Sequence, residues 1–256
     1  SRPTTGEADP GARDAPNTPA ALLDLPDVDL AARASERVRA LADTVPGTAD
    51  IRFAPADAPV LRALLRCLRE EDARTTLGVL AERELEDSAA SGTHRTPAPL
   101  ADLAARLLPP GTTRVLDPAC GGGGLLEAAA RRGATTLYGQ DLLPVQARRA
   151  AVALLLAAPG AAVTVREGDS LRADAFPDLV AEAVLCVPPY GDRDWGHDEL
   201  ACDPRWAYGL PARAESELAW VQHALARLAP GGRAVLVLPP AVASRPSGRR
   251  IRKELL

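Results

Sequence analysis

An acidic residue followed by a run of glycines stands near the middle of the chain, where the surrounding pattern predicts a strand and then a helix. Residues 115–126 read Val-Leu-Asp-Pro-Ala-Cys-Gly-Gly-Gly-Gly-Leu-Leu, so Asp117 ends an apolar run and four glycines precede a helical segment. Such a turn lets a nucleotide-like ligand approach the backbone closely, where any Cβ would collide. A carboxylate there repels a pyrophosphate at the helix N-terminus but suits a ligand that carries an ammonium group. The pattern therefore predicts a site for S-adenosylmethionine (SAM); the alternative is a turn that binds no ligand.

Two further acids follow later predicted strands. Asp141, in Tyr-Gly-Gln-Asp, comes 24 positions after Asp117, and wound α/β folds place a ribose-binding acid about 20 residues beyond the glycine turn. We therefore expect Asp141 to bind the ribose hydroxyls of SAM, which is compatible with a role in capping the next helix. Asp169, in Glu-Gly-Asp-Ser-Leu, follows the third strand. Gly-Asp alone is a common turn, but its register with the other two acids favours a ligand contact.

Strands and helices alternate after Ser91-Gly92. The predicted strands are residues 113–117, 135–140, 162–167, 183–187 and 233–238, and the predicted helices are residues 100–108, 125–132, 145–158, 215–228 and a last one from residue 249. This alternation predicts an α/β fold with a doubly wound, mainly parallel sheet. In such a sheet the ligand lies at the carboxyl ends of the central strands.

The first part of the chain has a different character. Residues 1–19 are rich in Pro, Gly and small polar side chains, which predicts a disordered tail. Residues 20–90 repeat apolar positions every three or four residues, which predicts a separate helical module. Arginines lie on the opposite helix faces, and solvation of these faces is favoured over contact with DNA. Residues 91–256 then form the sheet domain.

Composition narrows the class of protein further. With 46% hydrophobic residues and a net charge of −4, the 256-residue chain is globular and unlike a free-standing basic DNA-binding protein. It contains no apolar run of about 18 residues, as a membrane span requires, and no signal-peptide pattern. The cysteines form no Cys-x-x-Cys pair, which argues against a metal site and for the reducing cytoplasm. They are Cys67, Cys120, Cys186 and Cys202.

The segment Asp117–Gly124 resembles the Asp-Pro-Ala-Cys-Gly-Ser-Gly-Gly motif of adenine-N6 DNA methyltransferases, in particular the modification subunits of type I restriction–modification systems. It differs from that motif only at Gly122. The resemblance runs from about residue 72 to residue 256. It implies DNA as a partner, together with specificity and restriction subunits. Because the family continues with two more strands, the resemblance also implies that the methyltransferase domain is truncated at its C-terminus.

The resemblance also implies a set of SAM contacts. Leu142 is expected to lie against the adenine ring, and Asp169 is expected to accept from the adenine amino group. The family's Thr-Pro turn closes over the methionine end, and here His94 and Arg95 replace the aromatic pair that precedes it. The complete expected cofactor set is Thr96, Pro97, Asp117, Ala119, Gly121, Gly123, Asp141, Leu142, Asp169 and Ser170.

The end of the fourth predicted strand resembles the family's catalytic motif. Residues 186–191 read Cys-Val-Pro-Pro-Tyr-Gly, where adenine-N6 methyltransferases have Asn-Pro-Pro-Tyr or a close variant. In the family, the Asn side chain and the first Pro carbonyl accept the hydrogens of the poorly nucleophilic adenine amine, and the aromatic ring stacks on the flipped-out base. Pro188, Pro189 and Tyr190 are retained, but Val187 offers no side-chain acceptor. Loss of one such contact typically costs on the order of 10² to 10³ in rate.

Three functions are consistent with these patterns. The first is a SAM-dependent adenine-N6 DNA methyltransferase of type I character. The second, motivated by Val187, is a catalytically degenerate relative that binds SAM together with DNA or a partner protein. The third, a small-molecule methyltransferase, is weaker, because Pro-Pro-Tyr at the fourth strand is typical of methylation of planar amines.

Overall fold

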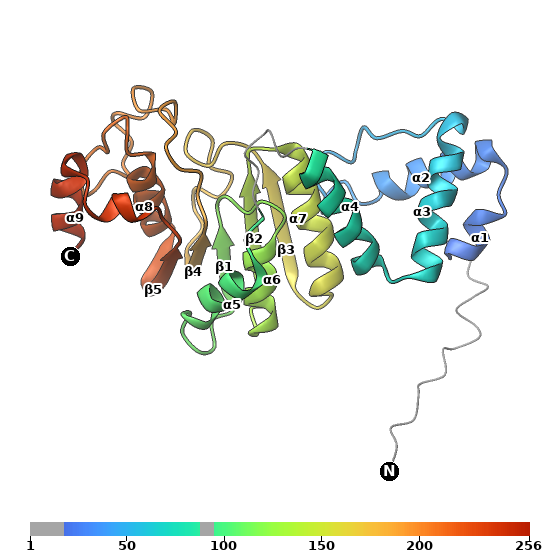
Figure 1. The fold of residues 1–256 in the computed structure, drawn as a ribbon, viewed down its shortest axis with the longest axis horizontal. Helices are drawn as coiled ribbons and strands as arrows, with labels where there is room; N and C mark the ends of the chain where they lie inside the picture. Colours follow the sequence, from blue (N-terminus) through green and yellow to red (C-terminus); the bar gives the residue numbers. More distant parts are fainter. Residues whose placement is uncertain (1–17, 88–94) are drawn as a thin grey trace, which may run out of the picture. The chain divides into compact units, whose positions relative to one another are not determined.

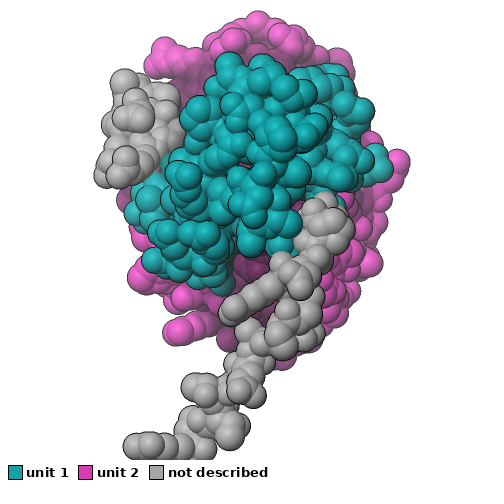
Figure 2. Space-filling model, turned by 90° about the vertical axis from the view of Figure 1, so that its right-hand side faces the viewer, with its two compact units in different colours: residues 1–43, 47–91 teal, residues 44–46, 92–256 magenta. Residues whose placement is uncertain are grey.

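The computed structural model describes residues 18–87 and 95–256, which fall into two compact units (Figures 1 and 2). The first unit comprises residues 1–43 and 47–91, and the second comprises residues 44–46 and 92–256. The tail predicted over residues 1–19 lies outside the described residues, apart from its last two. There the structure differs from the prediction, because Pro19 already begins a helix whose first turn is capped by the Thr18 side chain.

The described part of the first unit is helical. Its helices are α1 (Pro19–Leu23), α2 (Asp27–Arg39), α3 (Ala58–Glu70) and α4 (Ala73–Asp87), with the short 3-10 helix η2 (Pro55–Asp57) before α3. Prolines in the first turn of α1, η2 and α3 fit positions where a missing N–H costs nothing. α3 packs against α1 and α2. Arg62 of α3 strengthens this packing by donating to Leu25 O at 2.7 Å and pairing with Asp27 at 2.6 Å.

The second unit is built on a five-stranded sheet in the order β3-β2-β1-β4-β5, in which every neighbouring pair is parallel. The strands are β1 (Arg114–Asp117), β2 (Thr136–Asp141), β3 (Ala162–Glu167), β4 (Ala181–Cys186) and β5 (Leu228–Leu236). The helices are α5 (Ala98–Arg106), α6 (Gly124–Arg131), α7 (Pro144–Ala157), α8 (Ser216–Ala226) and α9 (Arg249–Leu255), with η4 (Pro240–Ala243) and η5 (Pro246–Gly248) before α9. The predicted doubly wound α/β fold is confirmed (Figure 1).

β5 begins five residues earlier than the sequence predicts. Ala181 pairs with Leu228 and Ala183 pairs with Arg233, so β5 bulges between these two positions. The bulge contains Pro-Gly-Gly, in which Gly231 has a φ of +78°. Proline and glycine usually mark a turn, whereas here they let the extra residues of the bulge leave the ladder.

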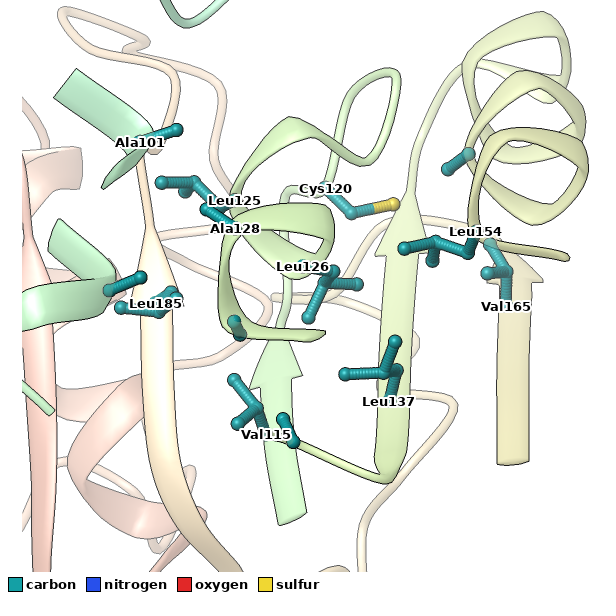
Figure 3. Packing of buried hydrophobic residues seen from close by; sticks show 14 of the residues in the cluster. Ala101, Val115, Cys120, Leu125, Leu126, Ala128, Leu137, Leu154, Val165 and Leu185 are labelled. Atoms are coloured by element: carbon teal, nitrogen blue, oxygen red, sulfur yellow. The ribbon is translucent and has the colours of Figure 1, made fainter. Parts of the chain in front are cut away.

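Apolar side chains cover both faces of the sheet, as strand alternation requires. On β4, Ala183 and Leu185 belong to one core cluster, whereas Val184 and Cys186 belong to others. Figure 3 shows the first cluster, in which strand residues such as Leu137 meet Leu126 of α6 and Leu154 of α7. The sheet is therefore a rigid, doubly covered platform for the loops at its carboxyl edge. In the described ranges, 18–87 and 95–256, no helix has the length and apolarity of a membrane span.

Candidate functional site

The strand order reverses between β1 and β4, and the predicted site lies at this point. From β1 the chain proceeds to β2 on one side, whereas β4 pairs with β1 on the other side. In open α/β sheets, ligands bind outside the carboxyl ends of the strands at such a reversal of strand order. Asp117 ends β1, Asp141 ends β2, and Val187 follows β4 directly. The topology therefore brings three of the predicted site residues to one edge.

Asp117 is buried and only half satisfied. Its side chain accepts a hydrogen bond from the Ala119 N–H at 3.1 Å, but its other oxygen, Oδ2, has no partner among the described residues. Burial raises the pKa of Asp117 to about 8, and the nearby charge of Asp141 adds to the increase. An unsatisfied buried carboxylate is costly. The geometry is therefore poised for a cation.

The glycine turn is shaped by backbone conformations that favour glycine. Gly121 and Gly123 have φ values of +51° and +89°. A Cβ at Gly123 would lie 3.2 Å from the Ala150 Cα, so α7 packs directly against the turn. A Cβ at Gly121, in contrast, would meet no described residue within 4 Å. The turn is thus tight on its inner side and open at Gly121.

Asp141 fixes the glycine turn to the start of α7. Its two carboxylate oxygens accept from the Gly121 N–H at 2.8 Å and the Leu143 N–H at 2.9 Å. Burial also raises the pKa of Asp141. Leu143, rather than Asp141, is the N-cap residue of α7. Leu142 between them is 64% exposed, so its side chain is accessible for packing against a ligand.

The loop after β3 joins the same edge. Asp169 Oδ1 accepts from the backbone N–H groups of Leu171 and Arg172, at 2.9 and 3.2 Å, and Oδ2 pairs with the Arg172 guanidinium at 3.1 Å. The buried Ser170 hydroxyl donates to Pro118 O at 2.6 Å. This bond joins the Asp169 loop to the loop that follows Asp117.

The Pro-Pro-Tyr segment leaves β4 beside these loops. Val187 is partly buried against the core, Pro188 is buried, and Tyr190 is 66% exposed. The Gly191 N–H donates to the buried Glu217 carboxylate at 3.3 Å, which anchors the end of the segment to α8. An exposed aromatic ring on an anchored loop is suited to stacking against a planar ligand.

Thr96 and Pro97 are placed differently. They immediately precede α5, which packs against α6 through its alanines, and Pro97 is the helix N-cap residue. In the described part of the chain, the hydrogen bonds that join the acids to the glycine turn do not extend to this pair. Arg95 is exposed, and His94 lies outside the described residues.

Two polar residues near the site were not predicted. The buried Gln140 side chain donates to Ala173 O at 2.9 Å and accepts from the Ala175 N–H at 3.0 Å, so it holds the segment that follows Asp169. Its position beside Asp141 in Tyr-Gly-Gln-Asp was the available signal. Arg205 donates to the Ser170 and Leu171 carbonyls of the same loop, and it precedes a Trp-Ala-Tyr-Gly segment that resembles the family.

Comparisons with known proteins agree with this geometry. A family model described as N-6 DNA methylase matches residues 77–256. The type I restriction enzyme HindI methylase subunit of Haemophilus influenzae is 30% identical over 156 residues, which cover 58% of this chain and 35% of that protein. The chain thus spans about a third of the length of this curated relative.

Two solved structures share the fold. The type I restriction–modification system methyltransferase subunit from Streptococcus thermophilus superposes with a TM-score of 0.72 at 21% identity, over 93% of this chain and 58% of that one. A Listeria monocytogenes protein described as a class I S-adenosylmethionine-dependent methyltransferase gives a TM-score of 0.58 at 15% identity, over 94% of this chain and 79% of that one. The family match confirms the resemblance predicted from the Asp117–Gly124 motif. The chain belongs to the N-6 DNA methylase family.

Proposed function

We propose that this chain is a SAM-dependent methyltransferase domain that methylates the N6 amine of adenine in DNA, as part of a type I restriction–modification methylase. The observation that carries the proposal is the buried, unpartnered Asp117 oxygen beside an open glycine turn, one strand away from Pro188-Pro189-Tyr190. SAM, when bound, supplies a methyl group activated on a sulfonium sulfur. The chain's own residues bind and orient the cofactor and the target amine.

The residues at the carboxyl edge fit SAM. Asp117 Oδ2 has no hydrogen-bond partner in the described part of the chain and matches the ammonium of the methionine part. The open space at Gly121 admits a ligand close to the backbone. We assign the ribose to Asp141, the adenine ring to Leu142 and the adenine amino group to Asp169. Ser170, Ala119 and Gly123 shape these loops, and Thr96 and Pro97 are assigned to the methionine end by the family motif alone.

On the base side, we assign the two roles that the retained residues support. Tyr190 stacks on the flipped-out adenine, and the Pro188 carbonyl accepts one hydrogen of its amine. Pro189 keeps the segment extended, and Val187 supplies no second side-chain acceptor. This substitution motivates one alternative, a SAM-binding family member with little or no transfer.

Isothermal titration followed by transfer of a tritiated methyl group separates these functions. We expect S-adenosylhomocysteine to bind the native chain, and Asp141→Ala to weaken that binding about tenfold or more, since a charged hydrogen bond contributes about 1.5–3 kcal/mol. Asp178→Ala, at an exposed position, is the matched control and should bind normally. Unchanged affinity in Asp141→Ala would contradict the placement of the ribose.

The transfer assay then identifies the acceptor. Labelled adenine in DNA supports the proposal, binding without transfer supports the degenerate alternative, and transfer only to a metabolite supports a small-molecule enzyme. We further propose that the chain acts in the cytoplasm with specificity and restriction subunits, since the HindI relative is named as a subunit. Co-purification with a specificity subunit from the same source tests this assembly.

A further inference from the structure

Arg205 lies in the segment between β4 and α8, and its guanidinium makes five hydrogen bonds although its side chain is only 8% exposed. Nε and Nη2 donate to the two carboxylate oxygens of Asp203, both at 2.8 Å. Nη1 donates to Ser170 O at 3.2 Å and contacts His223 Nδ1 at 2.8 Å, and Nη2 also donates to Leu171 O. A guanidinium has five N–H donors in a fixed plane. Every donor of Arg205 is therefore used.

The two carbonyl groups that Arg205 holds come directly after Asp169. Asp169 accepts from the Leu171 N–H at 2.9 Å, and the Ser170 hydroxyl donates to Pro118 O at 2.6 Å. The peptide units beyond Asp169 are thus fixed by Arg205 on one side and by the loop after β1 on the other. A binding group is effective only when its supporting residues hold it to within about 0.5 Å. These hydrogen bonds therefore affect how precisely the Asp169 carboxylate is placed for a ligand.

His223 of α8 accepts a hydrogen bond from the Arg205 guanidinium. Its side chain is buried, and its contact with an Arg205 N–H requires Nδ1 to be an acceptor, so the imidazole must be neutral. Burial lowers the pKa of His223 to about 4; the adjacent guanidinium groups of Arg205 and Arg227 act in the same direction, against the carboxylates of Asp174 and Asp203. The ring therefore remains an acceptor at neutral pH.

Arg205 also borders a buried apolar cluster. Its guanidinium carbon lies 5.3 Å from the ring centroid of Trp206, which packs in a buried cluster with Leu171 and Trp195. The same cluster contains Cys186, the residue before Val187. The segment that carries Arg205 thus contacts the loop beyond Asp169 and the end of β4.

We propose that Arg205 is a positioning residue, which holds the Ser170 and Leu171 carbonyls so that the Asp169 carboxylate meets the adenosine end of the cofactor. This inference rests on the proposed function, because it presumes that Asp169 binds that end. If Arg205 had a purely structural role, its substitution would lower the stability of the fold without a specific effect on binding of one end of the ligand.

Calorimetric titration of the chain with S-adenosylhomocysteine and with 5′-methylthioadenosine, which lacks the amino acid part, tests the proposal. Arg205→Met should weaken both ligands by the same factor, about tenfold or more. Asp117→Asn should weaken only S-adenosylhomocysteine. In a background of Asp169→Ala, Arg205→Met should weaken binding less than about twofold, because a residue that acts through another loses its effect when that one is removed.

Matched variants separate positioning from folding. Arg252→Met removes the donors to the Val242 and Arg245 carbonyls, which lie far from Asp169 in the sequence. This variant should lower the melting temperature without changing either affinity. If Arg205→Met does not fold, Arg205→Lys keeps the charge beside Asp203 but not the planar fork, and should still weaken both ligands. His223→Asn, which keeps an acceptor, should bind more tightly than His223→Leu.

Four results would overturn the proposal. These are native affinity in a folded Arg205→Met or Arg205→Lys variant, a loss confined to S-adenosylhomocysteine, an undiminished loss in the Asp169→Ala background, and equal affinity in the two His223 variants. Failure of the native chain to bind either ligand would instead refute the proposed function, and this inference with it.

Discussion

The pKa of Asp117 predicts that cofactor binding depends on pH in a way that an adenosine fragment does not share. Burial raises this pKa to about 8, so below pH 8 the ligand-free carboxyl group is mostly protonated. In our assignment, the ammonium of S-adenosylhomocysteine pairs with the ionised form. Binding should therefore release a proton, and affinity should rise with pH up to about 8.

The magnitude follows from the fraction of protein that is competent to bind. With a pKa of about 8, about one molecule in ten carries the Asp117 charge at pH 7 and about one in a hundred at pH 6, and the observed Kd rises in proportion. We expect S-adenosylhomocysteine to bind about tenfold more weakly at pH 6 than at pH 7. Burial also raises the pKa of Asp141, but that residue faces the ribose in our assignment and affects both ligands alike.

Titration calorimetry between pH 6 and pH 8.5 measures this effect. 5′-Methylthioadenosine is the control ligand, and the ratio of the two Kd values isolates the contribution of Asp117. Asp117→Asn keeps an acceptor for the Ala119 N–H and should make the ratio independent of pH. Parallel pH profiles for the two ligands in the native chain would refute the assignment of the ammonium to Asp117.

Three further outcomes are expected. In ligand-free protein, Asp117→Asn should raise the melting temperature at pH 8–9, and this advantage should shrink toward pH 4. The reason is that the raised pKa of about 8 makes the folded native chain lose stability as the pH rises from about 4 to about 8, whereas Asn does not titrate. An unchanged melting temperature contradicts this. By denaturant unfolding, Gly123→Ala, at φ +89° and 3.2 Å from the Ala150 Cα, should cost about 1–3 kcal/mol. Gly122→Ser should cost less, because its Cβ would meet only side-chain atoms among the nearest described neighbours, Arg149 Cδ at 3.3 Å and Gln146 Oε1 at 3.8 Å; equal costs would contradict the packing. Val187→Asn should raise methyl transfer to adenine in DNA by about 10² without changing cofactor affinity, and transfer that stays at the native rate despite normal binding would place the defect elsewhere.

The regular parts of the fold were predictable because local pattern and tertiary context agree. β1 to β4 end at acids or just before proline, and the structure reproduces their predicted carboxyl-terminal ends within a residue, although β4 begins two residues earlier than predicted. The start of β5 could not be predicted, because Pro-Gly-Gly normally marks a turn. Only pairing with β4 retains this segment in the sheet. Strand identity is thus encoded locally, but a bulge depends on its partner strand.

The candidate site divides in the same way. The three acids and the glycine turn could be located from spacing, because parallel strands deliver their carboxyl ends to one edge. The residues that hold the Asp169 loop in place could not be predicted from spacing. Arg205 and His223 come from segments more than 30 positions beyond Asp169, and no local pattern reveals that these polar residues are buried. Likewise, only the packed structure shows that one Asp117 oxygen has no partner within residues 18–87 and 95–256.

The substitution at Val187 bears on chemistry and leaves the cofactor side intact. Asp117 and Asp141 end β1 and β2, and Asp169 follows the end of β3 by two residues, whereas Val187 follows β4. Loss of one oriented acceptor costs on the order of 10² to 10³ in rate, whereas enzymes accelerate reactions by about 10⁶ or more. In our assignment, the Pro188 carbonyl and Tyr190 orient the amine independently of the missing side chain, and orientation together with proximity to the activated methyl typically supplies the larger share. The magnitudes therefore favour a slowed methyltransferase over a protein that only binds the cofactor.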